Sequence, residues 1–462
     1  MKIITLFATL LLLNTSSVLA GEGGDLYKQS CAQCHGAHRE GGLGPSLLKR
    51  PWVKVDGKKD SLQRFISEGL PNTGMPAWKN VLNPKQIAAI AEYLLLPEPA
   101  TQVANTKEAP ADPYPELKKF RLPVGFSISV YSDQLENARG MAVTASGIVF
   151  VGSRKVGKIY AVINSGKDNV PPKVVTVAKG LDSPIGLTLL NGSLYVAEMT
   201  RVIRFDDIEK TYEKSPQLHV VKDDFPKDKW HGEKIIKAGP DGKLYIPIGA
   251  PCNVCDKEDA PHSKIYRMNP DGSGFEIYAR GIRNSVGFAW HPITREMWFT
   301  DNGRDEMGDN MPSDKLNYAP KPGMHFGFPY CAGGVVEDPE FHKNRRCEEF
   351  AEPAAKLGPH VASLGLAYNE GTQFPTQYKN QLFIAEHGSW NRTQKIGYRV
   401  ALITLHNNKV VSDTVFVDGF LQDEKVIGRP VDIAFLPDGS MLISDDFGGR
   451  LYRVSYSEKI KP

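Results

Sequence analysis

Residues 431–444 have the sequence Val-Asp-Ile-Ala-Phe-Leu-Pro-Asp-Gly-Ser-Met-Leu-Ile-Ser, which is an apolar segment, a turn and a second apolar segment. The Asp-Gly pair tolerates the positive φ of a tight turn, so this stretch predicts a β-hairpin. Several copies of the pattern are followed by a third apolar segment, such as 158–162, 263–268 and 450–454. Five further copies begin at Gly140, Ile185, Lys234, Val286 and Leu364.

A unit of this kind, repeated roughly every 40 to 50 residues, is typical of a β-propeller in which each four-stranded sheet forms one blade. We therefore predict an all-β six-bladed β-propeller over residues 117–462. A β-sandwich is the alternative, but six self-similar copies are more than a sandwich normally contains.

The chain before residue 117 has a different composition. Residues 21–96 favour helix and end in an apolar-periodic stretch, 84–96, with Ile87, Ile90 and Leu94 at helical spacing. Residues 97–116 combine five prolines with Ala, Thr and Glu, a composition that stays extended. The sequence thus predicts a small all-α domain at 21–96, a linker at 97–116 and the propeller.

The overall composition and the first twenty residues restrict the class of protein. With 462 residues, 41% hydrophobic, 24% charged and a net charge of +3, the chain is neither disordered nor collagenous. The small net charge excludes nucleic acid as the main partner. Residues 1–20 resemble an export signal, with Lys2 before an apolar run too short for a signal anchor. We expect a periplasmic or secreted protein with no stable membrane insertion.

The strongest chemical motif is Cys31-Ala32-Gln33-Cys34-His35. This arrangement attaches haem c, because both thiols bond to the porphyrin and the adjacent imidazole ligates the iron. Met75 is the candidate for the second axial ligand, while His38 lies too close to His35 to reach the opposite face. The alternative is a C-x-x-C disulfide that precedes a histidine by chance. Residues 44–45, Gly-Pro, are a candidate backbone support beneath the haem.

These residues carry a resemblance. Residues 21–96 are similar to class I cytochromes c, whose motif Cys31, Cys34, His35 and Met75 match. The resemblance implies one-electron transfer through a covalently bound haem.

The other four cysteines are expected to form two disulfides, Cys252 with Cys255 and Cys331 with Cys347. An oxidising compartment favours this pairing over a metal site or redox-active thiols. A zinc site needs four ligands, and Cys331 and Cys347 are not in a close pair that would complete one.

Several polar residues lie next to the ends of the predicted strands near the propeller axis, and each taken alone is a surface charge. Around one axis they predict a cationic pocket able to hold a flat polycarboxylate through bidentate arginine contacts. They are Arg139, His231, Arg283, Asn284, His387 and Arg429.

Seven short motifs in this half resemble the pyrroloquinoline quinone (PQQ) dependent soluble sugar dehydrogenases, the glucose/sorbosone dehydrogenase group with six-bladed propellers. Their order along the chain is that of the family. They lie at 230–232, 239–245, 251–256, 281–284, 300–303, 386–392 and 428–432.

The resemblance implies a role for each matching residue. His231 matches the general base, and the backbone carbonyls of Gly303 and Arg304 match the segment that holds a calcium ion. The resemblance implies PQQ contacts at Arg139, Arg283, Asn284, His387, Arg392 and Arg429. This chain departs from the glucose dehydrogenase pattern at Val431, which replaces an arginine, at Arg304, which replaces a proline, and near His387, where a lysine is replaced. The departures favour the sorbosone and aldose branch.

The function expected from these resemblances is oxidation of an aldose, or of a related aldehyde or alcohol, by hydride transfer to PQQ. Electrons then pass singly to haem c and on to a downstream acceptor. One alternative is a calcium-dependent lactonase, for which Asp301, Asp305 and Glu306 would supply metal ligands. Another is a carbohydrate-binding propeller without turnover, whose cytochrome serves another enzyme.

Overall fold

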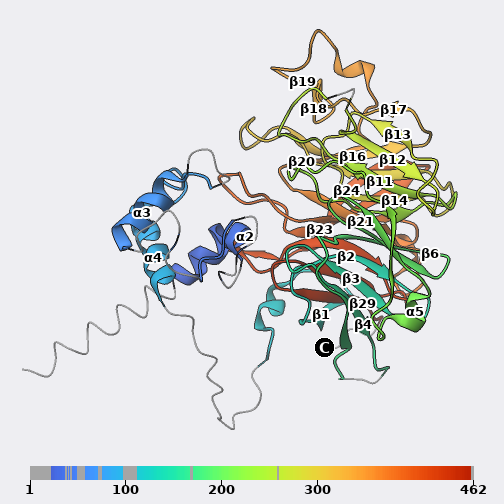
Figure 1. Cartoon of the computed structure of the whole chain (residues 1–462), viewed down its shortest axis with the longest axis horizontal. Coiled ribbons are helices and arrows are strands. Elements are labelled where there is room, and N and C mark those ends of the chain that lie inside the picture. Colours follow the sequence, from blue (N-terminus) through green and yellow to red (C-terminus); the bar gives the residue numbers. More distant parts are fainter. Residues whose placement is uncertain are drawn as a thin grey trace, which may run out of the picture. The chain divides into compact units, whose positions relative to one another are not determined.

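The computed structural model of the protein describes residues 22–36, 39, 41, 44–48, 52, 58–70, 75–96, 112–166, 170–257 and 260–458. The chain divides into two compact units, Met1–Pro113 and Tyr114–Pro462 (Figure 1). The predicted export signal and residues 97–111 of the predicted linker lie outside the described residues. The last residues of that linker belong to the second unit, where Glu116 pairs with Arg450 at 2.8 Å.

The first unit is helical, as predicted. Residues 22–30 are helical and are followed by α2 (Ala32–His35), α3 (Lys59–Glu68) and α4 (Pro84–Leu95). Helix α4 begins after Asn83, whose side chain accepts from the N–H groups of Lys85 and Gln86. Such a cap satisfies donors that have no partner inside the helix. The apolar positions recognised in the sequence, including Ile87 and Ile90, are buried on one face of α4.

The core of this unit depends on a close approach of two backbones. A Cβ atom at Gly23 would lie 2.1 Å from the carbonyl oxygen of Ala89, so only glycine lets helix 22–30 pack directly on α4. Beside this crossing, the rings of Tyr27 and Tyr93 lie 5.3 Å apart. These contacts fix the helix that leads into the Cys31–His35 motif.

The second unit is a six-bladed β-propeller, which confirms the predicted fold (Figure 1). Each blade is an antiparallel sheet of four strands, and each predicted hairpin forms its first two strands. The first three blades contain β2 (Ala138–Val143), β3 (Val149–Ser153), β4 (Ile159–Ile163) and β5 (Lys173–Ala178); β6 (Gly186–Leu190), β7 (Ser193–Ala197), β8 (Val202–Phe205) and β9 (Leu218–Lys222); and β10 (Lys237–Ala238), β11 (Leu244–Ile248), β12 (Lys264–Met268) and β13 (Glu276–Arg280), to which β17 (Met324–His325) adds in parallel.

The last three blades complete the ring. They contain β14 (Gly287–Trp290), β15 (Met297–Asp301), β16 (Ser313–Ala319) and β20 (Ala355–Pro359); β21 (Ser363–Tyr368), β22 (Leu382–Glu386), β23 (Arg399–His406) and β24 (Lys409–Val417); and β27 (Pro430–Phe435), β28 (Met441–Asp445), β29 (Arg450–Tyr456) and β1 (Phe126–Ser132). The segments outside the blades contain further short helices and strands. They are η1 (Pro115–Lys119), α5 (Ile208–Thr211), β18 (Cys331–Ala332), β19 (Val336–Glu337), η2 (Cys347–Glu349), η3 (Thr376–Tyr378), β25 (Leu421–Gln422) and β26 (Lys425–Val426).

The ring is closed by strands from both ends of this unit. Strand β1 pairs antiparallel with β29, so that Phe126 lies opposite Tyr456. The Phe126 ring then packs edge-on against the rings of Phe374 at 4.7 Å and Phe416 at 5.0 Å, which belong to the neighbouring fifth blade. Closure therefore joins the first and last segments of the propeller and buries an aromatic cluster between two blades.

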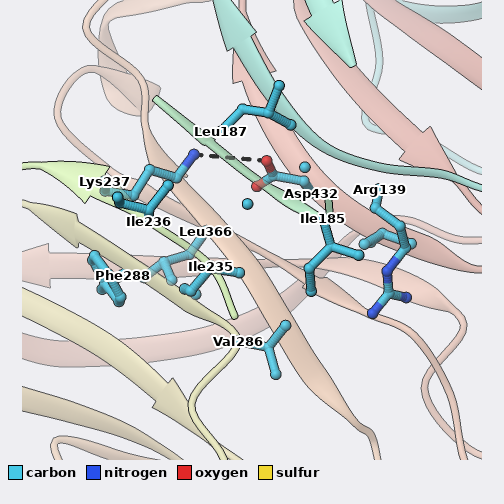
Figure 2. A pocket seen from close by; sticks show the side chains of 14 residues that line it. Arg139, Ile185, Leu187, Ile235, Ile236, Lys237, Val286, Phe288, Leu366 and Asp432 are labelled. Carbon is cyan, nitrogen blue, oxygen red and sulfur yellow. Dashed lines mark ion pairs between the residues drawn. The ribbon is translucent and has the colours of Figure 1, made fainter. Parts of the chain in front are cut away.

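The innermost strands β2, β6, β10, β14, β21 and β27 surround a narrow central channel (Figure 2). Its lining is mainly apolar and includes Ile185, Ile236 and Phe288, with one ion pair between Lys237 and Asp432 at 3.7 Å. A Cβ atom at Gly287 would lie 2.1 Å from the carbonyl oxygen of Leu364 in the next blade. The inner strands thus approach one another too closely for a side chain at this position.

Both predicted disulfides, Cys252–Cys255 and Cys331–Cys347, are present. No helix in the described part of the chain combines the length and the hydrophobicity that a bilayer-spanning helix requires.

Replacing Phe126 with alanine should destabilise the propeller, because it removes a phenyl group from the aromatic cluster between the fifth and sixth blades. We expect the free energy of unfolding to fall by about 3 kcal/mol, measured by urea denaturation. Val124 lies two residues away and is 82% exposed, so Val124→Ala is the matched control and should change stability by less than about 0.5 kcal/mol. Equal effects of the two substitutions would contradict this account of closure.

Candidate functional site

The CxxCH motif of the first unit is arranged for haem attachment. Cys31 and Cys34 are not joined in a disulfide, contrary to the alternative interpretation, and His35 ends α2. His35 Nδ1 lies 2.8 Å from the carbonyl oxygen of Pro45. A Cβ atom at Gly44 would lie 2.6 Å from the His35 ring, so this glycine packs directly against the imidazole. Residues 44–45 thus support the His35 imidazole, and their predicted place beneath the haem stays a prediction.

A hydrogen bond to one ring nitrogen of a metal-ligating histidine fixes the tautomer and assigns coordination to the other nitrogen, here Nε2. The residues present therefore fit a haem. Met75 lies in the same unit, where its carbonyl oxygen accepts from the N–H of Leu70 at 3.1 Å. Its role as second axial ligand stays a prediction, and His38 lies outside the described residues.

In the propeller, antiparallel pairing brings the predicted site residues to one face. The start of each innermost strand and the end of its hairpin partner lie at the same edge of the blade. Arg139 in β2, Arg283 and Asn284 before β14, His387 after β22 and Arg429 before β27 all lie at this edge. His231, which precedes β10 in the third blade, is on the same side.

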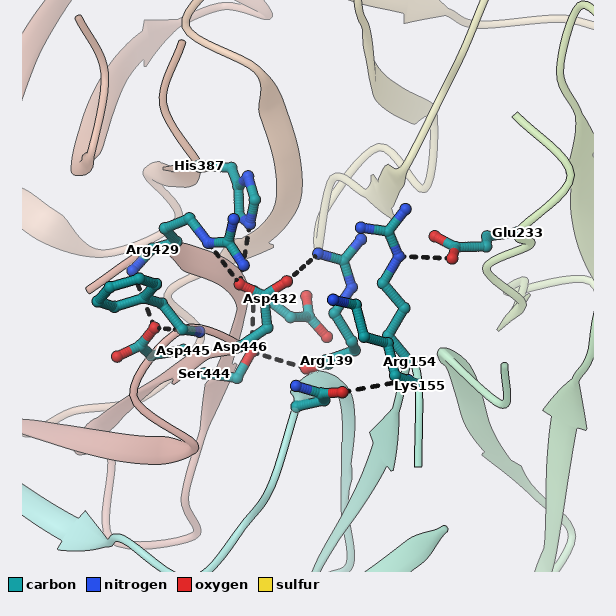
Figure 3. A network of polar contacts seen from close by, with 12 residues as sticks. Arg139, Arg154, Lys155, Glu233, His387, Arg429, Asp432, Ser444, Asp445 and Asp446 are labelled. Atoms are coloured by element: carbon teal, nitrogen blue, oxygen red, sulfur yellow. Dashed lines mark hydrogen bonds and ion pairs between the residues drawn. The ribbon is translucent and has the colours of Figure 1, made fainter. Parts of the chain in front are cut away.

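Three of these residues converge on a carboxylate that the sequence analysis did not select. Asp446 accepts from Arg139 at 2.9 Å, from Arg429 at 2.9 Å and pairs with His387 at 3.0 Å (Figure 3). The four side chains come from the first, fifth and sixth blades, and Asp446 is only 5% exposed. We refer to Arg139, His387, Arg429 and Asp446 as the Asp446 cluster.

The charges of the Asp446 cluster follow from burial and pairing. Burial alone would raise the pKa of Asp446, but Arg429, His387 and Arg139 outweigh it and hold the pKa well below its ordinary value. Burial lowers the pKa of His387 to about 4 despite its pairing with Asp446. At neutral pH the cluster therefore combines two guanidinium groups, one carboxylate and one neutral imidazole, and its net charge is positive.

A second group forms around Arg283, which is 4% exposed. Its guanidinium donates to Asp305 at 3.1 Å and to the side-chain oxygen of Asn253 at 3.0 Å. The backbone of Ala250 links this group to His231. The Ala250 N–H donates to the Arg283 carbonyl, and the Ala250 carbonyl oxygen lies 2.8 Å from His231 Nδ1. Burial and the neighbouring Arg283 lower the pKa of His231 to about 3. His231 is therefore a neutral imidazole at neutral pH.

The remaining predicted residues have other contacts. Asn284 is held by its backbone N–H, which donates to Asp301, and Gly303 donates in the same way to Asp314. The structure does not bring Arg392 to either group, because its guanidinium donates to Asp309, Asn310 and Gln394. The side chain of Arg304 pairs with Asp338 at 2.8 Å and Glu340 at 3.1 Å.

The arginines of the predicted cationic pocket are partly compensated by carboxylates that the sequence did not single out as their partners. Asp446 and Asp305 compensate the arginines, and Glu233 pairs with Arg154 on the same face (Figure 3). Uncompensated buried charges are costly, so each buried guanidinium requires such a partner. The sequence carried a signal for Asp446 alone, which directly follows one of the buried carboxylates that recur where the second strand of a blade ends. These recurring carboxylates are Glu198, Asp301, Glu386 and Asp445.

Several buried polar atoms at this face have no hydrogen-bond partner within the part of the chain that the structure describes. They are Arg139 Nε, Ser285 Oγ, Asn302 Oδ1, Ser363 Oγ and Asn391 Oδ1. Native proteins rarely leave buried polar atoms unsatisfied, and a bound polar ligand is one explanation. The donors among them, Arg139 Nε and the hydroxyls of Ser285 and Ser363, fit a ligand that carries several carboxylate and carbonyl groups. Among the described residues, no group of three or more His, Cys, Asp or Glu side chains forms a metal site.

Comparisons with known proteins agree with this description of the two units. Residues 120–457 match the family model described as TrAA12-like, and residues 19–94 match that of the cbb3-type cytochrome c oxidase subunit III. An uncharacterised protein of Borreliella burgdorferi is 35% identical over 359 residues, which are 74% of this chain and 91% of the relative.

Two solved structures share the fold of the propeller. The calcium structure of the Trichoderma reesei carbohydrate-active enzyme of family AA12 has a TM-score of 0.64 at 17% identity and covers 73% of this chain and 97% of its own. The holo PQQ domain of Coprinopsis cinerea pyranose dehydrogenase has a TM-score of 0.60 at 15% identity, with the same coverage. The chain therefore belongs to the TrAA12-like family and joins that family's six-bladed propeller to an N-terminal cytochrome c domain.

Proposed function

We propose that the protein is an exported quinohaemoprotein dehydrogenase that oxidises an aldose, or a related aldehyde or alcohol, with PQQ, calcium and haem c as cofactors. The observation that carries the proposal is the convergence of Arg139, His387 and Arg429 on Asp446, at the same propeller face as His231. The positive charge and the orphaned donors there suit a ligand with several carboxylates. The Coprinopsis neighbour, described as holding PQQ, supports this choice of ligand.

When bound, PQQ would supply a two-electron acceptor, calcium a Lewis acid beside it and haem c a one-electron acceptor. The arginines of the Asp446 cluster would bind carboxylates and orient the ligand plane. Arg283 would bind at the same face, held by Asp305 and Asn253. The backbone carbonyls of Gly303 and Arg304 remain the proposed calcium ligands, and the Trichoderma neighbour described as a calcium structure supports that metal.

The geometry around His231 supports its proposed role as the general base. Its Nδ1 faces the Ala250 carbonyl, which requires a proton on Nδ1 and makes Nε2 the proton acceptor. Because its pKa is lowered to about 3, Nε2 carries a lone pair throughout the neutral range. Nε2 would therefore accept the proton of a substrate hydroxyl directly, because it carries no proton of its own that must leave first. Its backbone lies in the left-handed region at φ 48°, a conformation that residues other than glycine rarely adopt and that recurs at functional sites.

The lactonase alternative has less support from the geometry. Asp301 pairs with Lys315 at 3.2 Å and Asp305 with Arg283 at 3.1 Å, so two of the three carboxylates assigned to the metal already balance buried cations.

Export is supported by the two disulfides, which persist in oxidising compartments. The proposed partners are a sugar substrate and a downstream electron acceptor.

The central experiment follows the haem spectrum of the full chain loaded with PQQ and Ca²⁺. Addition of an aldose should reduce the haem, and His231→Gln should slow this reduction at least about 100-fold, because general-base catalysis is lost. Chemical reduction of the haem by dithionite should be unaffected in the variant, which serves as the control. Failure of a panel of aldoses, aldehydes and alcohols to reduce the haem would contradict the proposal.

Loss of one arginine of the Asp446 cluster should weaken PQQ binding. We expect Arg429→Ala to raise the dissociation constant at least about 30-fold, since a buried charge-assisted contact contributes about 2 kcal/mol or more. Equilibrium titration of the PQQ-free protein measures this. Arg453→Ala is the matched control, because Arg453 pairs with Asp438 in the hairpin turn at the opposite edge of the same blade. Similar losses of affinity in both variants would argue against the assigned site.

The lowered pKa of His231 also predicts a pH dependence of stability. Below its ordinary pKa of 6.5 the unfolded chain protonates this histidine, whereas the folded protein does so only near pH 3. The stabilising contribution is therefore present above pH 6.5 and is lost as the pH falls towards 3. Between pH 7.5 and 5, wild type should lose about 1 to 2 kcal/mol more than His231→Gln in urea unfolding. Parallel pH profiles would show that His231 titrates normally.

A further inference from the structure

Asn253 lies between the two cysteines of the Cys252–Cys255 disulfide and forms hydrogen bonds with both Arg283 and Asp305. Its side-chain oxygen accepts from the Asp305 N–H at 2.8 Å and from Arg283 at 3.0 Å. Its amide nitrogen donates to the Asp305 carbonyl at 3.2 Å, and its backbone carbonyl accepts from Arg283 Nε at 2.8 Å. One residue thus holds the guanidinium and the backbone of the 303–305 segment together.

Asp305 completes the link from the other side. Its carboxylate accepts from Arg283 at 3.1 Å and from the side chain of Asn391 at 2.8 Å. Burial lowers the pKa of Arg283, and the pairing with Asp305 opposes that shift. The guanidinium therefore depends on this set of acceptors, because a buried cation that loses hydrogen bonds must find others or move.

The second disulfide restrains the same segment. Arg304 pairs with Asp338, which is 1% exposed, and the Asp338 N–H donates to the Tyr330 carbonyl at 2.8 Å. Tyr330 precedes Cys331, the residue that is bonded to Cys347. Residues 303–305 are therefore held on one side by the Cys252–Cys255 loop and on the other by the Cys331–Cys347 loop.

We propose that Asn253 is a positioning residue of the site and that the Cys252–Cys255 disulfide fixes it so that Arg283 and the 303–305 backbone are presented to the cofactor. This inference rests on the proposed function for the identity of the cofactor. A disulfide that closes so short a loop restricts the directions that Asn253 can take. Since misplacing a binding group by about 1 Å can cost about 100-fold, such a restraint affects the ligand and not only the fold.

The test compares four forms of the full chain with haem attached: wild type, Asn253→Ala, Asn253→Asp and the double variant Cys252→Ser/Cys255→Ser. Two properties are measured on the PQQ-free protein, the dissociation constant for PQQ and the amide hydrogen exchange of the peptide that contains 303–305. Asn253→Ala and the double cysteine variant should raise the dissociation constant at least about 10-fold and accelerate that exchange. Asn253→Asp keeps the two side-chain acceptor contacts and should restore part of the affinity.

Asn369→Ala is the matched control for a purely structural role. Asn369 is also buried, donates to the Tyr378 carbonyl and accepts from the Gly371 N–H, but it lies in the β21–β22 hairpin at the opposite edge of its blade. It should lower the thermal midpoint and leave the PQQ dissociation constant within about twofold of wild type. Should Asn253→Ala fail to fold, Asn253→Asp and the double cysteine variant carry the same comparison.

The proposal is overturned if the Asn253 and cysteine variants keep wild-type affinity and exchange, or lose affinity only in proportion to their thermal midpoint. Failure of the proposed function is distinguishable, because wild type would then not bind PQQ at all. In that case the exchange of 303–305 alone decides whether Asn253 and its disulfide position the segment.

Discussion

Closure of the ring by β1 and β29 is the constraint on which the candidate site depends. The pairing makes the sixth blade a neighbour of the first, and it thereby brings Asp446 within 2.9 Å of Arg139, which is 307 residues earlier in the chain. Without closure these two blades would be free ends, and the buried carboxylate would lose one of its two arginines. The same interaction that completes the fold therefore completes the charge balance at the face of the propeller.

Pairing of buried arginines with carboxylates explains the arrangement of charged groups at this face better than an excess of positive charge does. Buried arginines are tolerated because Asp446, Asp305 and Glu233 lie against them, and burial keeps His231 and His387 neutral. The face is consequently rich in fixed donors while its net charge stays small. Such a preorganised arrangement binds an anionic ligand without the cost of assembling isolated cations in the interior.

The two units contribute different kinds of rigidity. In the cytochrome unit the close helix crossing at Gly23 and the contact between Pro45 and His35 fix one imidazole. In the propeller, strand ends alone do not fix the site, and two disulfide loops reach from the third and fourth blades to the 303–305 segment. The sheets thus determine where the loops lie, and the disulfides restrict the conformations that these loops can adopt.

The sequence by itself determined the repeat, the helical N-terminal unit and the CxxCH motif, because each depends on local spacing: hairpin turns, helical periodicity or a cysteine pair. Both disulfides were also predicted, because an oxidising compartment favours pairing of the four remaining cysteines. The sequence also identified Arg139, His387 and Arg429, since they flank strands of recognisable repeats. Only the tertiary structure decided that these three meet at Asp446, that Arg392 is held elsewhere and that Asn253 braces Arg283. Those contacts join residues from different blades, and no local pattern specifies which loop ends meet when six sheets close around one axis.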